Sequence, residues 1–400
     1  MYEFIGLTGV VALIAVVVLV KRMLAPGGSR SAAARPRRRS AAPRTATAPA
    51  PTSAHAASEV NAEPATPVAV AAVPAAIDKF RLIDEWELPS VRKEELLVAL
   101  RTVAKPPGSI KALLSPKILA GEDANELIQF ILREPIIAAK VLAAVNSPLY
   151  GLTTPIVSAG QAVTFLGLTT VRNVVLQTLT RDSFKAGDPA LQRVCDGLWN
   201  CATIASEICH RVAQRMGMAN PGALSTQALL SYFGDFAVLT LFAEHSRRVD
   251  WQAGLLARTV AEQRDLGVNA RTLGCLLMRD WHLPDEIVDG VLEDGRVLVT
   301  PPECYPPQRA ARLAVCYAST RLGERIAFGN LRDLSGFNFR SGDEPDYFYL
   351  NRYLARPELS RFYEHLHAQE TCDIVRRYAL EPWVPSGEPT APRAPSATHR

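Results

Sequence analysis

The sequence predicts an all-α fold, and three observations predict it. Apolar residues after residue 77 recur at the three- and four-residue spacing of helices, and alternating strand patterns with turn dipeptides are largely absent. Several segments also begin with side chains that cap helices. The 400 residues are 48% apolar, which allows a sizeable core and excludes a wholly disordered chain. We therefore expect short packed helices joined by short turns.

The first 24 residues are expected to form a transmembrane anchor. Residues 4–20 are uncharged and apolar, and as a helix they would span about 26 Å. Lys21 and Arg22 can reach toward the headgroups while the chain continues to residue 24, which approaches the roughly 30 Å hydrocarbon core. A cleaved signal peptide is the alternative, but such peptides carry their basic residues before the apolar run, whereas here the bases follow it.

The basic residues after the apolar run predict the orientation of the anchor. Eight bases and no acid occur between residues 21 and 44, so the net charge of +4 arises in this segment and the remaining chain is mildly acidic. The positive-inside rule then places everything after Lys21 in the cytoplasm. A basic nucleic-acid surface on the folded body is not expected. The residues taken to determine topology are Lys21, Arg22, Arg35, Arg37, Arg38 and Arg39.

Composition divides the rest of the chain into four parts. Residues 25–77 are rich in Ala, Pro and Arg and poor in large apolar residues, which predicts a disordered linker. Residues 78–300 are expected to form a helical domain, and residues 301–385 a C-terminal helical subdomain. The Pro-rich residues 386–400 are expected to be a disordered tail.

Helix boundaries can be placed from capping patterns. Asp123-x-x-Glu126 and Ser158-x-x-Gln161 each have the form of a capping box, and Pro135 suits the first turn of a helix between them. Gly167 is expected to separate the helix after Ser158 from the next one. Longer periodic stretches follow at residues 189–216, 225–245, 251–266, 269–281 and 284–293.

Side chains that could support catalysis or hold a metal are few. The seven histidines form no His-Glu-x-x-His, His-Asp or His-x-x-His pattern, and the seven cysteines form no Cys-x-x-Cys pair. Most cysteines are expected to be small buried hydrophobes. No phosphate-binding loop or nucleophile elbow occurs. We therefore predict no catalytic residue, no cofactor and no metal ligand.

An aromatic cluster lies between residues 337 and 353. Such side chains could stack on nucleic-acid bases, but these lie among Asp343, Glu344 and Asp346, which would repel phosphates. The cluster is therefore expected to pack in the core of the C-terminal subdomain.

One stretch carries a more specific pattern. Residues 133–136 read Arg-Glu-Pro-Ile, residues 146–151 read Asn-Ser-Pro-Leu-Tyr-Gly, and residues 161–173 contain Gln-Ala-Val, Leu-Gly-Leu and Val-Arg-Asn in that order. This order and spacing resemble the HDOD family, the HD-related output domain of bacterial signalling proteins. Trp199, Glu262 and residues 281–284 continue the resemblance, which covers roughly residues 88–295. The resemblance implies a fold similar to that of HD-type metal-dependent phosphohydrolases.

The sequence departs from that family where the metal ligands would stand. Cys201 replaces the histidine of a Trp-x-His motif, and Ser231-Tyr232 stands in place of His-Asp. A later histidine corresponds to Asn269 or Ala270, depending on register, and a His-His pair corresponds to Glu293-Asp294. The inherited hydrolysis needs a metal-activated water, so these departures imply loss of the chemistry.

The motif at residues 146–151 supplies the candidate site. Asn146, Ser147, Tyr150 and Gly151 form either a structural turn or a contact surface for a partner. Asn146 and Ser147 can bond nearby backbone at a helix end, and Tyr150 and Gly151 suit a tight turn. Turn residues on a surface also often carry function, so both interpretations stay open.

The apolar segment and the resemblance together predict a membrane-tethered bacterial signalling protein. Its HDOD-like domain is expected to be non-catalytic and to act in the cytoplasm through protein–protein contact, while residues 4–24 cross the inner membrane once. Its partner would be an unidentified cytoplasmic or membrane-associated protein. The alternative is a divergent HD-type metal-dependent phosphohydrolase or cyclic-nucleotide phosphodiesterase. A third possibility is capture of RNA or DNA by the Arg-rich segment, although no nucleic-acid partner is expected.

Overall fold

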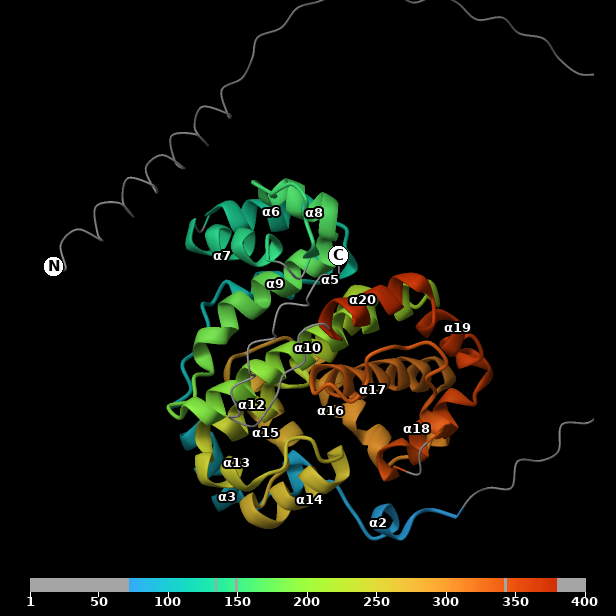
Figure 1. The fold of residues 1–400 in the computed structure, drawn as a ribbon. Helices are drawn as coiled ribbons and strands as arrows, with labels where there is room; N and C mark the ends of the chain where they lie inside the picture. The colour runs from blue at the N-terminus through green and yellow to red at the C-terminus, as the bar shows by residue number, and fades with distance from the viewer. Residues whose placement is uncertain (1–71, 134, 148–149, 342–343, 380–400) are drawn as a thin grey trace, which may run out of the picture. The chain divides into compact units, whose positions relative to one another are not determined.

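The computed structural model describes residues 72–379 except residues 134, 148, 149, 342 and 343 (Figure 1). The predicted anchor, its topology-determining bases, the linker up to residue 71 and the tail lie outside the described residues. The chain divides into two units, Met1–Ala69 and Val70–Arg400, and every described residue belongs to the second unit. Across the described ranges, none of the helices has the length and apolar character needed to cross a membrane.

All regular structure in the described residues is helical, as the sequence predicts (Figure 1). The α-helices are α2 (Ala75–Asp78), α3 (Ser90–Leu100), α4 (Ile110–Leu113), α5 (Pro116–Ala120), α6 (Ala124–Arg133), α7 (Pro135–Val145), α8 (Ala159–Leu166), α9 (Leu168–Thr180), α10 (Pro189–Arg215), α11 (Pro221–Leu230), α12 (Phe233–Leu241), α13 (Ala243–Arg248), α14 (Leu255–Leu266), α15 (Ala270–Asp280), α16 (Asp285–Asp294), α17 (Pro307–Ala327), α18 (Phe348–Leu354), α19 (Phe362–Leu366) and α20 (Gln369–Ala379). Short 3₁₀ turns are η1 (Glu85–Glu87), η3 (Arg181–Ser183), η4 (Gly295–Leu298), η5 (Pro302–Cys304), η6 (Phe339–Ser341), η7 (Pro345–Tyr347) and η8 (Pro357–Leu359).

The predicted capping residues begin the helices that the sequence indicates. Asp123 accepts a hydrogen bond from the backbone N–H of Glu126 at 2.8 Å, at the start of α6. Ser158 caps α8 by accepting from the N–H of Gln161 at 3.2 Å, and the Gln161 side chain accepts in return from the N–H of Val157 at 2.9 Å. Gly167, with φ of +83°, separates α8 from α9. These local predictions are confirmed.

Two boundaries differ from the prediction. The periodic stretch 225–245 is interrupted by turns, so that α11, α12 and α13 replace one long element. Periodicity cannot show these turns, because the apolar spacing continues through them while the chain changes direction to pack α12 against α15. The linker was expected to reach residue 77, but α2 begins at Ala75 and the side chain of Ile77 is buried. Ordered structure therefore begins earlier.

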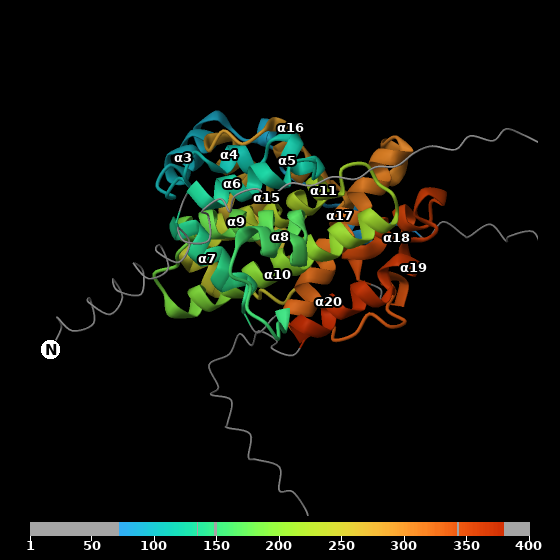
Figure 2. The same cartoon turned by 90° about the horizontal axis from the view of Figure 1, so that it is seen from above.

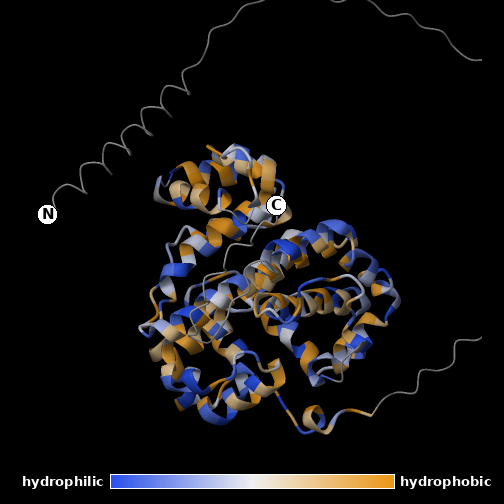
Figure 3. Cartoon of the chain, in the orientation of Figure 1, coloured by the Kyte–Doolittle hydropathy of each residue, from blue (hydrophilic) through white to orange (hydrophobic). Residues whose placement is uncertain are grey.

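The long helix α10 lies at the centre of the fold, beside α17 and α11 (Figures 1 and 2). Gly323 of α17 allows the close crossing with α10, because a Cβ there would lie 2.6 Å from the carbonyl oxygen of Cys201. Helices α6, α7 and α8 pack together and onto α9, and α20 packs on both α10 and α17. Polar and apolar residues are interspersed along the helices, as amphipathic packing requires (Figure 3).

One hydrophobic core contains residues from both segments that the sequence separates at residue 300. In its middle, Phe236 stacks on Trp199 with ring centroids 4.2 Å apart, and Phe184 stacks on Phe236 at 5.1 Å. The aromatic cluster of the C-terminal segment is also in the core, since Phe339, Tyr347 and Tyr353 are buried. Its predicted packing role is confirmed.

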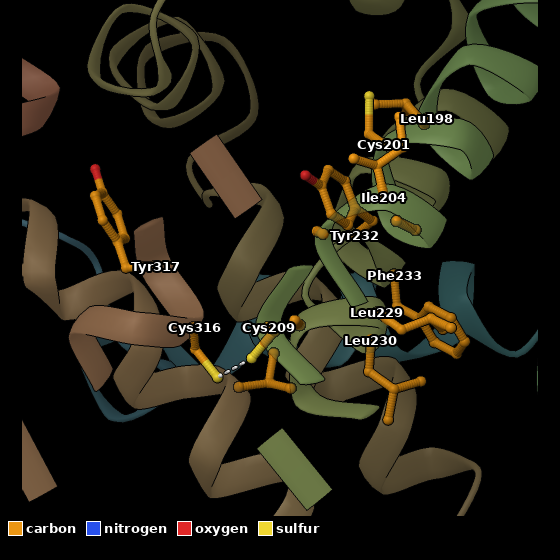
Figure 4. Packing of buried hydrophobic residues seen from close by; sticks show 14 of the residues in the cluster. Leu198, Cys201, Ile204, Cys209, Leu229, Leu230, Tyr232, Phe233, Cys316 and Tyr317 are labelled. Atoms are coloured by element: carbon orange, nitrogen blue, oxygen red, sulfur yellow. Dashed lines mark hydrogen bonds between the residues drawn. The ribbon is translucent and has the colours of Figure 1, made fainter. Parts of the chain in front are cut away.

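The cysteines behave as the sequence predicts. Six of the seven are buried and Cys304 is exposed. Cys209 and Cys316 face each other across α10 and α17 with their Sγ atoms 3.7 Å apart (Figure 4). These side chains fill the core as small hydrophobes.

The contact between α12 and α15 provides a test of the packing. A Cβ on Gly234 would collide with the carbonyl of Ala270, whereas a Cβ on Gly160 would meet nothing closer than 4.0 Å. We expect Gly234→Ala to lower the free energy of unfolding by more than about 2 kcal/mol, because backbone must move to admit the methyl group. Gly160→Ala should be neutral or stabilising by up to about 1 kcal/mol, since alanine favours helix. Urea denaturation of both variants measures the difference, and equal effects would contradict this packing.

Candidate functional site

Four positions at which the sequence departs from the HDOD pattern converge on one cavity. Ser231, Tyr232, Asn269 and Ala270 line a space of about 30 Å³, which is enough for roughly one water molecule. They lie at the junction of α11 with α12 and at the start of α15. Cys201 of α10 is fully buried near Tyr232 (Figure 4). These departing positions therefore lie together in space around one small cavity.

A cluster of charged side chains lies beside this space, and two of its members, Asp235 and Arg321, line it. Arg258 of α14 donates through Nη2 to Oε1 of Glu324 of α17 at 2.7 Å. Arg321, one turn before Glu324, donates to both oxygens of the same carboxylate at 2.9 and 3.0 Å. Asp235 of α12 lies 3.7 Å from Nη1 of Arg258. We call Asp235, Arg258, Arg321 and Glu324 the buried ion cluster.

Within this cluster, neighbouring opposite charges stabilise the ionised states of Glu324 and Arg258 away from water. Burial alone would raise the pKa of Glu324, but Arg258 and Arg321 outweigh it and hold that pKa below its ordinary value. Burial opposes the charge on Arg258, yet Glu324 and Asp235 raise the pKa of its guanidinium. Burial raises the pKa of Asp235. The guanidiniums of Arg258 and Arg321 are 2% and 6% exposed, so they are ions of the interior.

The other groups around the cavity are occupied by structural hydrogen bonds. Tyr232 donates through its hydroxyl to the carbonyl of Thr320 at 2.8 Å. Glu262 accepts from the N–H of Ala270 at 2.7 Å, and burial raises the pKa of Glu262 to about 8. Asn269 caps α15 by accepting from the N–H of Thr272 at 2.9 Å. These contacts fix helix ends and leave little polar capacity directed into the cavity.

The residues present do not fit the metal ion that HD-type phosphohydrolases use. The positive charge at this position comes from two guanidiniums, and the carboxylate of Glu324 is already shared between them. Glu293 is engaged elsewhere, accepting from Nε of Arg309 at 2.8 Å, and Asp294 is buried close to Cys316 and Arg271. Within the described part of the chain, no group of three His, Cys, Asp or Glu side chains is arranged to hold a metal ion.

The motif at residues 146–151 divides between two roles. The side chain of Asn146 holds the backbone of Ile156 against the end of α7. Its Nδ2 donates to the carbonyl of Ile156 at 2.7 Å, and its Oδ1 accepts from the N–H of Ile156 at 2.7 Å. Gly151 has φ of +57°, a backbone conformation that favours glycine, and the backbone carbonyl of Ser147 accepts from the N–H of Tyr150 at 3.1 Å in the same turn. Of the four, Tyr150 lines a cavity.

The cavity beside Tyr150 has a volume of about 310 Å³ and lies between α9, α10 and α20. The guanidinium of Arg377, on α20, lies 5.8 Å from the centroid of the Tyr150 ring. The floor is a buried polar network in which Asn173 donates to Ser206 at 2.6 Å and to Ser225 at 2.9 Å. We call this space the Tyr150 cavity.

Behind the floor lies Arg172, which is fully buried and has no carboxylate partner among the described residues. It donates to Oγ1 of Thr226 and to the carbonyl of Gly222, each at 2.7 Å. Burial lowers the pKa of Arg172 to about 9, so the side chain still carries its charge at neutral pH.

Sequence reasoning missed the buried ion cluster. Asp235, Arg258, Arg321 and Glu324 match no motif, and they come from three separate helices. One signal was available, because Arg321 and Glu324 stand three apart in a helix whose other positions are mostly small or apolar. Charged residues at that spacing on a core helix indicate a buried pair.

Comparisons with known proteins agree with the fold. Residues 110–296 match the family model described as HDOD domain. The crystal structure of an HDOD domain protein with unknown function from Geobacter sulfurreducens is 20% identical, with a TM-score of 0.51 over 72% of this chain and 99% of that one. A "Putative phosphohydrolase" from Shewanella amazonensis SB2B is 18% identical, covering 72% and 98% of the two chains with a TM-score of 0.46. A "Putative signal transduction protein" from Marinobacter aquaeolei VT8 is 17% identical, covering 73% and 66% with a TM-score of 0.47. The search of curated proteins finds no match.

Removing the shared carboxylate tests the buried ion cluster. We expect Glu324→Gln to lower the free energy of unfolding by about 3–5 kcal/mol, because two buried guanidiniums lose their counter-ion. Glu364→Gln, which breaks an ion pair with Arg361 on the surface, should change it little. Urea denaturation of the two variants measures the contrast. A small effect of Glu324→Gln would show that the cluster is hydrated in solution.

The raised pKa of Glu262 predicts how stability varies with pH. Its folded value of about 8 exceeds the ordinary value of 4.5, so the folded chain holds a proton that the unfolded chain releases. This contribution to stability is complete below about pH 4.5 and is lost as the pH rises toward 8. Asp294, whose pKa burial also raises to about 8, acts in the same direction.

We therefore expect Glu262→Gln to stabilise the chain more at pH 8 than at pH 5.5, relative to wild type. Glutamine resembles the protonated acid and can still accept from Ala270. Denaturation curves at the two pH values measure this, with Glu364→Gln as the control that leaves the pH dependence over this interval unchanged. A Glu262→Gln effect that is equal at both pH values would contradict the assignment.

Proposed function

We propose that this chain is a non-catalytic signalling protein whose HDOD-like domain acts by binding other proteins. The observation that carries the proposal is the buried ion cluster, two members of which, Asp235 and Arg321, line the cavity where the HDOD resemblance puts metal ligands. Two guanidiniums share the carboxylate of Glu324 there, and the adjoining space holds about one water molecule. A phosphate ester could not enter without breaking the cluster.

A contact role is supported by the surface of the lobe formed by α6, α7 and α8. Large apolar side chains are exposed on it, since Leu132 is 53%, Val157 66% and Phe165 61% exposed. All three lie on α6 or α8 or just before α8, two helices that pack together, and exposed apolar surface is typical of sites that bind proteins. A non-catalytic role is compatible with the fold, because proteins of one fold can differ in function when the side chains at their sites differ.

We further propose that residues 4–24 tether this domain to the bacterial inner membrane, with the domain in the cytoplasm. The support is the apolar run and the bases that follow it. A tether of this kind raises the effective concentration of the domain for partners at the membrane. The partner would be another cytoplasmic or membrane-associated protein.

Turnover assays test the absence of catalysis. We expect the full chain, purified in detergent, to hydrolyse neither bis-p-nitrophenyl phosphate nor cyclic nucleotides when Mn²⁺, Fe²⁺ or Zn²⁺ is added. Asp235→Asn serves as the matched variant, because it removes a carboxylate beside the cavity. Turnover that depends on a stoichiometric metal and is lost in Asp235→Asn would establish the divergent phosphohydrolase instead.

Reporter fusions test the tether. A reporter joined after Arg44 should be active in its cytoplasmic form and inactive in its periplasmic form, because the bases after the apolar run stay inside. Deleting residues 1–24 should release the protein from the membrane fraction. Periplasmic activity of the Arg44 fusion would overturn the topology.

A further inference from the structure

We propose that the Tyr150 cavity binds a small anionic molecule through a carboxylate or phosphate group. This inference goes beyond the proposed function and does not depend on it, because it concerns a cavity away from the buried ion cluster, although Phe165 belongs both to its wall and to the exposed apolar surface of the α6–α8 lobe. It rests on the shape of the cavity, on its charge and on hydrogen-bonding capacity that the protein itself leaves unused.

The cavity has the size and lining of a small-molecule site. Its volume of about 310 Å³ is at the lower end of the range for ligand pockets. Apolar side chains of Phe165, Leu166 and Ile374 line one part, and polar side chains from α9 and α10 line the rest. A ligand with one charged end and a compact planar or apolar body would match this division.

The charge of the cavity is positive. Arg211 and Arg377 both line it, and the carboxylate of Glu207 is the acidic group that faces them. Arg172, charged and without a carboxylate partner in the described part of the chain, lies behind the floor and hydrogen-bonds to Asn173 at 3.2 Å. His210 is neutral at pH 7, because burial lowers its pKa to about 4. Three positively charged guanidiniums therefore lie in or behind the cavity wall, compared with one carboxylate.

That carboxylate is already satisfied. Oε2 of Glu207 accepts from Nη2 of Arg377 at 2.9 Å, and Oε1 accepts from the hydroxyl of Tyr378 at 2.9 Å. Glu207 therefore joins α10 to α20, and its two oxygens are committed to that contact. A cationic ligand would have to compete with both partners for this carboxylate.

The unused capacity consists mainly of donors. Nε of Arg211 is buried and has no hydrogen-bond partner in the described structure, and Nη1 of the same side chain makes only a long bond of 3.4 Å to Gln214. Nδ1 of His210 also has no partner there, but it is an acceptor, because the neutral ring donates to the carbonyl of Pro221 through its other nitrogen. A buried N–H without a partner costs free energy, and an anion that accepts from Arg211 would remove that cost. An acidic ligand is therefore favoured over a neutral or basic one.

Ligand binding would also stabilise α20. This helix supplies Ile374 and Arg377 to the wall, so an occupant contacts α10 and α20 together. The ligand contacts both helices only while α20 is packed against α10. Bound ligand therefore favours the packed position of α20.

Calorimetry with simple probes tests the inference. The full chain in detergent is titrated with phenyl phosphate and benzoate, and with benzyl alcohol and benzylamine as neutral and cationic controls of similar size. We expect at least one anion to bind at a single site, and both controls to bind more weakly. Tighter binding of phenyl phosphate would identify a phosphate ligand, and tighter binding of benzoate a carboxylate ligand.

Two variants on α10 locate the site. Arg211→Gln should raise the Kd of the anion by roughly tenfold or more, because a charge-assisted hydrogen bond is lost. Arg211 forms no ion pair in the described structure and makes only a long hydrogen bond to Gln214, so the variant should keep the wild-type circular dichroism spectrum. Arg193→Gln, on an exposed position of the same helix, is the matched control and should bind like wild type.

Hydrogen exchange supplies a second readout, in which the anion slows exchange of the α20 amides in wild type and not in Arg211→Gln. The inference is overturned if neither anion binds, if benzylamine or benzyl alcohol binds as tightly as the anions, or if Arg211→Gln binds the anion like wild type.

Discussion

A carboxylate shared by two buried guanidiniums constrains the centre of this molecule. Arg258, Arg321 and Glu324 come from α14 and α17, and each is buried so deeply that its charge is tolerable only beside the others. The interaction therefore holds two helices at fixed separation. With Asp235 it also reaches α12, whose Gly234 contacts α15. Packing and electrostatics depend on one another at this point.

The cluster explains what the C-terminal segment contributes to the fold. Arg321 and Glu324 lie beyond residues 110–296, the range that matches the HDOD domain. Without α17 the interior would hold Arg258 next to Asp235 alone, at a distance of 3.7 Å. The segment after residue 300 thus completes the core and supplies the carboxylate that accepts from Arg258. On our proposal it also closes the space in which related proteins would carry out chemistry.

Local features of this fold could be predicted from the sequence, while its long-range pairings could not. Asp123 and Ser158 start helices because the bonds they make span only three residues. The sequence also identified Ser231, Tyr232 and Asn269, because they differ from the HDOD pattern. In the structure these three residues line one cavity. The pairing of Arg258 with Glu324 spans 66 residues, and no periodicity encodes which charged residues of two helices will meet. The same holds for Tyr150, whose contact with Arg377 joins distant parts of the chain. The membrane anchor stays a prediction, since it lies outside the described residues.

On our proposal, guanidiniums stand beside the position at which an HD-type protein would bind metal. Anomalous diffraction from crystals soaked in Mn²⁺ tests it most directly, because the method places both the ions and the side chains. We predict no anomalous peak beside Asp235, Glu262 or Glu324, with Arg258 and Arg321 in contact with Glu324. A peak coordinated by these carboxylates, with the guanidiniums displaced, would contradict the account.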